Sequence, residues 1–214
     1  MDEVVLLIII ANVLFSMKGF KDRLFFDKYK FQIGPIRKGE KVRLLSSGFL
    51  HVDTSHLLFN MLTLYFFANA VIFHLGMIKF LVIYFRALIA GNLLALNFHK
   101  KDPYYSAVGA SGAVMGIIYA SIMLNPGMNL YMFFIPIPIP GYIFGVAYLM
   151  YSMFGMKKNW GNIGHSAHFG GAIGGYVLTL LLFPQIAVQN TMLVALLAVP
   201  IILMFIFKDK LERD

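Results

Sequence analysis

Seven apolar segments, most of them close to the length of a membrane-crossing helix, constrain this chain more than any other feature. An apolar helix needs roughly 20 residues to cross the hydrocarbon core of a bilayer. Because only short connections remain between the segments, the sequence leaves no room for a separate soluble domain. It therefore predicts an all-α, multi-pass membrane protein. The helices are expected at residues 3–17, 54–75, 78–98, 107–125, 131–153, 165–183 and 191–207.

Composition agrees with this class and narrows the choice of partners. Charged residues make up 13% of the chain, against about 25% in a typical soluble domain. The net charge of +8 comes from Lys and Arg residues beside apolar segments, which indicates contact with anionic lipid headgroups and not with nucleic acid. Because cysteine is absent from the sequence, disulfides, thiolate metal sites and a cysteine nucleophile are excluded.

Two connections have distinctive sequences. Residues 18–50 form the longest one, which is basic and amphipathic and is expected to lie at the membrane interface. From Ile135 to Gly141 isoleucine alternates with proline, which interrupts a helix, so the fifth helix is expected to become regular only at about residue 141. The acidic start of the first segment, at Asp2 and Glu3, disfavours a cleavable signal peptide.

Three polar side chains lie near the starts of alternate apolar segments. His56, Ser111 and His168 follow the first, third and fifth connections, which places them on the same side of the membrane. Polar groups within hydrocarbon are costly, and for this reason they often mark functional sites. We therefore expect these three side chains to converge at one depth.

Ser111 lies in the segment Gly109-Ala110-Ser111-Gly112 at the start of a predicted helix. Its small neighbours leave the hydroxyl uncovered, and the free amide groups of a helix N-terminus can bind developing negative charge. This environment suits a serine nucleophile, with Gly109 in the oxyanion and substrate-binding region. The alternative is that Gly112 and Gly116 form a packing face in which Ser111 is one more small residue.

His168 begins the sixth segment, in which Gly171 and Gly175 share one helical face and permit very close contact with another helix. If this face packs against the glycine face of the fourth segment, His168 comes within hydrogen-bonding reach of Ser111 and can act as its general base. The alternative is a histidine bonded to a backbone carbonyl.

His56 and Asn60 are four residues apart and project from one face of the second helix. Their side-chain N–H groups, together with the backbone N–H of Ser111, are predicted to form an oxyanion hole. The alternative is a polar contact that only joins helices. His51, five residues earlier, is expected at the membrane interface.

Carboxylates are scarce in the apolar part of the chain. Between residues 54 and 207 the only one is Asp102, in a connection, so hydrolysis has to use a Ser-His dyad in which packing orients the imidazole. A zinc protease is disfavoured because the sequence has no His-Glu-x-x-His run, and His165 with His168 supply only two possible ligands. We expect neither a metal nor a cofactor.

These motifs, in this order on alternate segments, resemble those of the rhomboid family of intramembrane serine proteases over roughly residues 40–183. The resemblance implies a six-helix catalytic core in residues 1–183, with one added transmembrane helix and a basic tail in residues 184–214. The matching elements are Arg43 with Gly48–His51, then His56–Asn60 as His-Leu-Leu-Phe-Asn, Tyr105–Gly116 and Ala167–Gly175.

For the chemistry, the resemblance implies that Ser111 is the nucleophile, that His168 is the general base and then the acid, and that His56 and Asn60 are oxyanion donors. Substrates of the family are membrane proteins that are cut in or near a transmembrane segment. The resemblance implies that this segment enters the active site laterally, beside the fifth helix. We therefore expect a serine endopeptidase in the plasma membrane of a bacterium. The alternatives are an inactive rhomboid-like protein that binds transmembrane helices and a small-solute or metal transporter.

Four positions depart from the family pattern. Met115 stands where an aromatic residue usually follows the serine by one helical turn, Val42 replaces a frequent tryptophan, and Ile72 replaces a frequent acid. Arg86, within the third segment, has no assigned partner.

The orientation in the membrane has two readings. Lys and Arg are concentrated on the side of Ser111, and the positive-inside rule places that side in the cytoplasm. The resemblance implies the opposite orientation, and we give it the greater weight because the charges of residues 18–50 can snorkel from an embedded loop.

Overall fold

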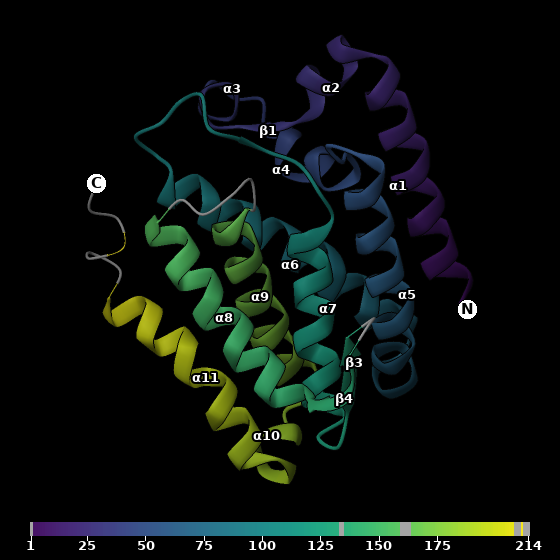
Figure 1. The fold of residues 1–214 in the computed structure, drawn as a ribbon, viewed down its shortest axis with the longest axis vertical. Helices are drawn as coiled ribbons and strands as arrows, with labels where there is room; N and C mark the ends of the chain where they lie inside the picture. Colours follow the sequence, from purple (N-terminus) through teal and green to yellow (C-terminus); the bar gives the residue numbers. More distant parts are fainter. Residues whose placement is uncertain (1, 133–134, 159–163, 208–210, 212–214) are drawn as a thin grey trace.

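The long helices of the protein lie side by side in the computed structural model, and the connections gather at the two ends of the bundle (Figure 1). The structure describes residues 2–132, 135–158, 164–207 and 211. Helices α1, α5 and α6 are long and apolar enough to cross a membrane, and α7 and α11 are shorter apolar helices. The main helices of the bundle are α1 (Glu3–Lys21), α5 (Thr54–Leu75), α6 (Met77–Phe98), α7 (Ser111–Leu124), α8 (Gly141–Lys158), α9 (His165–Leu182) and α11 (Thr191–Ile206).

These helices confirm the predicted all-α membrane class. Each overlaps one of the apolar segments. The division of the chain at residue 183 stays a prediction; α11, which follows it, packs against α8. Arg86 is exposed on α6.

Helix α7 is the centre of the bundle. Every residue from Gly112 to Leu124 is buried, and α5, α6, α8 and α9 all contact this helix. A helix that is apolar on all sides is stable only where other helices or lipid surround it. Ser111 is the first residue of α7, so it lies where the preceding connection enters the buried part of the bundle.

The contact between α7 and α9 is made by glycines. A Cβ on Gly171 would overlap the backbone of Gly112, with the Gly112 Cα only 2.9 Å away, and a Cβ on Gly175 would overlap the backbone of Gly116. Without side chains at these positions the two backbones touch directly, which is how small residues permit close packing between membrane helices. The two helix starts, with Ser111 and His168, are held close together as a result.

The basic connection predicted at residues 18–50 is folded into short elements above the bundle (Figure 1). Strand β1 pairs antiparallel with β2, which lies in the connection before α7, with Phe31 opposite Ala107. The elements are α2 (Arg23–Tyr29), β1 (Phe31–Gln32), α3 (Ile33–Arg37), α4 (Arg43–Ser46), the 3-10 helix η1 (Ser47–Phe49) and β2 (Ser106–Ala107).

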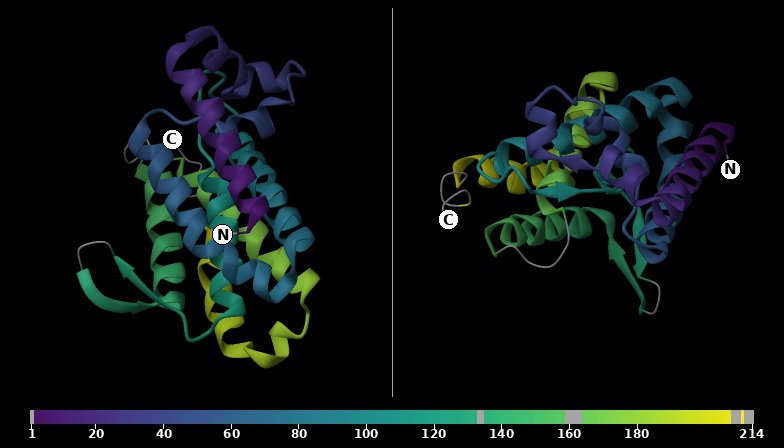
Figure 2. Two further views of the ribbon diagram at one scale, coloured as in Figure 1. Left: turned by 90° about the vertical axis from the view of Figure 1, so that its right-hand side faces the viewer. Right: turned by 90° about the horizontal axis from the view of Figure 1, so that it is seen from above.

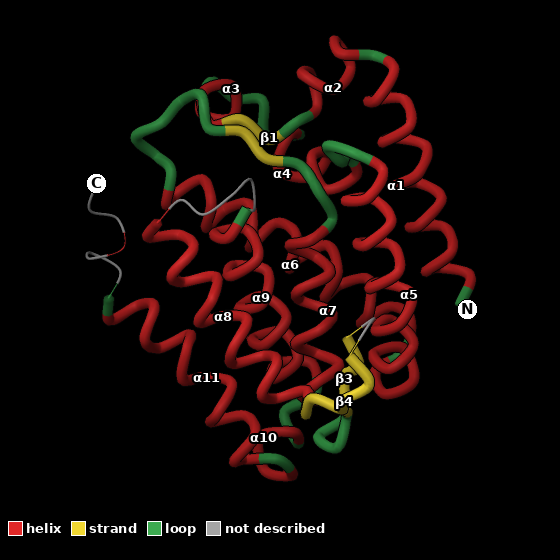
Figure 3. Tube along the Cα trace, in the orientation of Figure 1, coloured by secondary structure: helices red, strands yellow, loops and turns green. Residues whose placement is uncertain are grey.

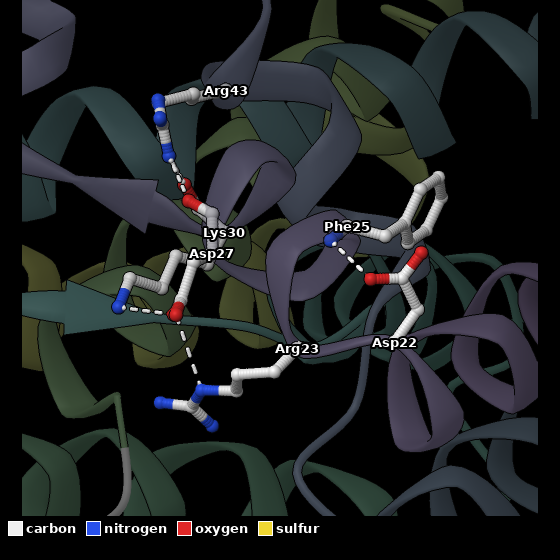
Figure 4. A network of polar contacts seen from close by, with 6 residues as sticks. All are labelled: Asp22, Arg23, Phe25, Asp27, Lys30 and Arg43. Carbon is white, nitrogen blue, oxygen red and sulfur yellow. Dashed lines mark hydrogen bonds and ion pairs between the residues drawn. The ribbon is translucent and has the colours of Figure 1, made fainter.

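Charged side chains tie these short elements together (Figure 4). Arg43, almost fully buried, donates to the backbone carbonyls of Asp27 at 2.7 Å and Lys30 at 3.0 Å, and pairs with Glu40 at 2.7 Å. The hydrogen bond from Lys30 holds the pKa of the Asp27 carboxyl below its usual value. Arg43 thus closes the connection on itself, so that it forms a folded cap and not a loose loop.

A β-hairpin occupies part of the predicted fifth span. Strands β3 (Asn129–Met132) and β4 (Ile135–Pro140) pair antiparallel and project from the side of the bundle (Figures 2 and 3). Helix α8 begins at Gly141, which confirms that the prolines delay it to about that residue. The expected span at 131–153 was wrong in its first part, because the proline-rich stretch forms a strand. A short helix, α10 (Ile186–Gln189), joins α9 to α11.

The glycine contact can be tested by adding a single methyl group. Gly171→Ala places a Cβ against the Gly112 backbone, so we expect the free energy of unfolding to fall by about 1–3 kcal/mol. Gly127→Ala is the matched control, because no atom lies within 4 Å of a Cβ at that position. Thermal unfolding in detergent micelles measures both; equal stability of the two variants would contradict the proposed close contact.

Candidate active site

The backbone before Ser111 is fixed by the folded connection above the bundle. The N–H of Gly109 donates to the carbonyl of Ser47 at 3.0 Å, and the N–H of Ala110 donates to Nε2 of His51 at 3.4 Å. Gly109 has a φ of 132°, in the region that favours glycine, and a Cβ there would lie 2.8 Å from the His56 ring. The turn into α7 therefore requires glycine at position 109.

Ser111 and His168 are within hydrogen-bonding distance. Nε2 of His168 lies 2.6 Å from Oγ of Ser111, and both residues are half-buried at the starts of α7 and α9. This contact joins helices that are far apart in the sequence, and it follows from the glycine packing below it. The arrangement is that of a nucleophile with its general base.

The second ring nitrogen of His168 also has a partner. Nδ1 lies 2.6 Å from the hydroxyl of Tyr148 on α8, and the two rings are stacked with centroids 6.0 Å apart. Met115, one turn after Ser111, is buried and lies in the wall of the same site. Tyr148 was missed by the sequence interpretation, because nothing in the aromatic-rich sequence of α8 distinguishes it from its neighbours.

The predicted oxyanion donors lie beside the serine. A Cβ built on Gly109 would be 2.9 Å from Nε2 of His56 and 3.6 Å from Oγ of Ser111, so these two atoms approach the same point. Nδ2 of Asn60 donates to the His56 carbonyl at 3.1 Å, which uses one of its two hydrogens and leaves the other for a ligand. The backbone N–H of Ser111 is in the first turn of α7, where a helix has no acceptor of its own.

These groups line a cavity of about 950 Å³. Its walls come from α5, α7, α8 and α9, from the connection before α7, and from residues of the folded cap and α6 such as Lys30, Ser47 and Asn92. Ser111, His168, His56, Asn60 and Gly109 all face it, so the structure gathers every predicted catalytic and oxyanion residue around one space. Among the described residues no group of three or more His, Cys, Asp or Glu side chains is arranged to hold a metal ion.

His51, which was expected at the membrane interface, has a fully buried side chain. Nδ1 contacts Oγ of Ser16 on α1 at 2.9 Å, and Ser16 donates to the Phe49 carbonyl at 3.0 Å. Since Ser16 uses its proton for that carbonyl, Nδ1 of His51 donates and Nε2 is free to accept from Ala110. Burial, with a smaller contribution from His56, lowers the pKa of His51 to about 3, so the ring is neutral at physiological pH.

The buried position of His51 predicts a pH-dependent stability. An unfolded imidazole has a pKa of about 6.5, so below this pH the unfolded chain binds a proton that the folded chain excludes. The neutral His51 ring therefore contributes fully to the free energy of unfolding above about pH 6.5. This contribution falls toward pH 3, by at most about 1.4 kcal/mol per pH unit. His51→Gln does not titrate, so the stability advantage of the wild type over this variant should shrink from pH 7 to pH 4. A difference between the thermal-unfolding midpoints of the two proteins that stays constant from pH 7 to pH 4 would contradict the neutral, buried state of His51.

Comparisons with known proteins find a domain family whose model covers most of this chain. The family model for the rhomboid domain matches residues 38–185. The chain is 29% identical over 187 residues to RHOMBOID-like protein 12, mitochondrial, of Arabidopsis thaliana, covering 79% of this chain and 55% of that protein. It is 30% identical to Rhomboid protein 1, mitochondrial, of Saccharomyces cerevisiae, covering 63% and 40%.

A bacterial relative has higher identity over a shorter stretch. The rhomboid protease GluP of Bacillus subtilis is 38% identical over 141 residues, which cover 66% of this chain and 26% of that protein. The chain thus spans about half the length of the two mitochondrial relatives and about a quarter of GluP.

Proposed function

Since this chain belongs to the rhomboid family, we propose that it is an intramembrane serine endopeptidase, which cuts membrane proteins in or near a transmembrane segment with a Ser-His dyad. One observation carries the proposal: Nε2 of His168 lies 2.6 Å from Oγ of Ser111 beside a cavity. The name of GluP, a rhomboid protease, supports the same class of reaction.

The proposed reaction uses the groups around the cavity in two steps. Oγ of Ser111 attacks the scissile carbonyl carbon while Nε2 of His168 takes the hydroxyl proton. The oxyanion is stabilised by the Ser111 N–H, His56 and Asn60. The imidazolium then protonates the leaving amine, which leaves an acyl-enzyme ester. A water molecule, deprotonated by His168, attacks the ester carbonyl carbon; the imidazolium then returns a proton to Oγ of Ser111 as the bond between Oγ and the acyl carbon breaks and the carboxylic acid product leaves.

A transmembrane substrate has to unwind locally before it can be cut. In a helix the backbone carbonyls are hydrogen-bonded within the segment, so a transmembrane helix must open before Ser111 can reach a peptide bond. Small, helix-weakening residues lower the cost of this opening. The cavity is lined by Phe59 on α5 and by Phe144 on α8, and we propose lateral entry beside α8.

The protein is an integral membrane protein, and we propose the plasma membrane of a bacterium as its location. The identity of 38% to a protein of Bacillus subtilis supports this assignment. Relatives named as mitochondrial also match, so fractionation of the source cells is the direct test.

The proposed function predicts the loss of proteolysis in two variants. In liposomes that contain a model single-span substrate, Ser111→Ala and His168→Ala should each reduce the cleavage rate by at least about 10³-fold, because each removes one member of the dyad. His74→Ala, at the opposite end of α5, should cleave at the wild-type rate.

Cleavage that survives Ser111→Ala would contradict the proposal. A wild-type protein that binds the substrate and does not cut it would instead favour the inactive, helix-binding alternative. Thermal unfolding of each variant shows whether it is folded.

A further inference from the structure

We propose that Tyr148 is the positioning residue for His168, and that its hydroxyl oxygen holds the imidazole in the tautomer that can accept the Ser111 proton. The inference rests on the proposed function. It is carried by the 2.6 Å contact between the Tyr148 hydroxyl and Nδ1 of His168, on the opposite side of the ring from the 2.6 Å contact with Ser111.

The two contacts together define what the tyrosine has to do. A neutral imidazole carries one proton, either on Nδ1 or on Nε2. His168 can act as a general base toward Ser111 only when Nε2 is unprotonated, which puts the proton on Nδ1. Nδ1 then donates to the oxygen of Tyr148. In a Ser-His-Asp triad an aspartate accepts this hydrogen bond and fixes the same tautomer.

No carboxylate takes this position in the described part of the chain. Asp102 accepts from the N–H of Tyr104 at 2.9 Å, within its own loop, and Asp53 accepts from the N–H of His56 at 2.7 Å at the start of α5. Met115 stands one turn after the serine and has only a thioether, a weak acceptor. Tyr148 therefore supplies the hydrogen-bonding group on Nδ1.

Packing within α8 and against its neighbouring helices holds the tyrosine ring in place. It stacks on Phe144, one turn earlier, with centroids 5.6 Å apart. The hydroxyl of Tyr119 on α7 donates to the Gly145 carbonyl on α8 at 2.6 Å, which ties the two helices together near Tyr148. A Cβ on Gly145 would lie 2.9 Å from Leu197 on α11 and 3.6 Å from the Tyr119 hydroxyl, so α8 packs closely against both α7 and α11 here. Pre-organised contacts of this kind keep an orienting group in place.

The orientation of His168 therefore depends on α8 as well as on α7 and α9. Ser111 and His168 are on α7 and α9, which touch through glycines, whereas Tyr148 is on a third helix, α8. A displacement of α8 away from α9 would withdraw the hydroxyl from Nδ1 and leave the distance between Ser111 and His168 unchanged.

Tyr148→Phe tests the proposal, because it removes the hydroxyl and retains the ring that stacks on Phe144. In the liposome cleavage assay we expect kcat to fall about 10- to 100-fold with KM unchanged, since the variant loses orientation of the base and keeps the substrate-facing ring. Tyr142→Phe, on the same helix, is the matched control and should retain the wild-type kcat. A Tyr148→Phe kcat equal to or above that of the wild type would overturn the proposal; an increase would mean that the hydroxyl donates to Nδ1 and stabilises the unproductive tautomer.

A second measurement does not depend on activity. Solid-state ¹⁵N NMR of histidine-labelled protein in liposomes separates protonated from unprotonated ring nitrogens, and the difference from His168→Gln assigns the signals. The wild type should show His168 protonated on Nδ1, and Tyr148→Phe should show a mixture of the two tautomers. Protonation of His168 on Nε2 in the wild type, or the same tautomer in Tyr148→Phe as in the wild type, would overturn the inference. This holds whether or not the protein cleaves a substrate. The expected NMR result with an inactive wild type would overturn only the proposed function.

Discussion

The direct contact between the backbones of α7 and α9 is the constraint on which the rest of the structure depends. In a bilayer the lipid tails are as apolar as the side chains, so helices associate through close packing and polar contacts and gain little from the hydrophobic effect. Gly112 and Gly116 meet Gly171 and Gly175 with no side chain between them. A larger residue at Gly171 or Gly175 would meet the α7 backbone and separate the helix starts that carry the serine and the histidine.

The second requirement is that polar groups in the bundle have partners. Asn92 on α6 donates to the Leu44 carbonyl at 2.7 Å and to Oγ of Ser47 at 3.2 Å, which anchors the folded connection onto the bundle. Ser47 in turn accepts from Gly109, and His51 accepts from Ala110. The connection that a hydropathy plot shows only as a long loop thus fixes the backbone directly before the nucleophile.

Much of the site could be predicted from the sequence because its signals are local or come from topology. Helix starts on alternate segments place Ser111 and His168 on one side of the membrane, four-residue spacing puts His56 and Asn60 on one face, and the prolines delay α8 to Gly141. Tyr148 and His51 could not be found in this way. The contact of Tyr148 depends on the rotation of α8 about its own axis relative to α9, and the burial of His51 depends on how residues 22–53 fold onto the bundle. The periodicity of a single segment indicates neither the rotation of one helix relative to another nor the fold of a long connection.

The central claim is that His168 activates Ser111, and covalent labelling with a fluorophosphonate measures this activation most directly, since the probe needs an activated serine and no protein substrate. The reaction is followed in liposomes, and mass spectrometry locates the modified residue. The account predicts one modification at Ser111 in the wild type and none in His168→Ala. Equal labelling of the two proteins, or a folded wild type that the probe does not label at all, would contradict it.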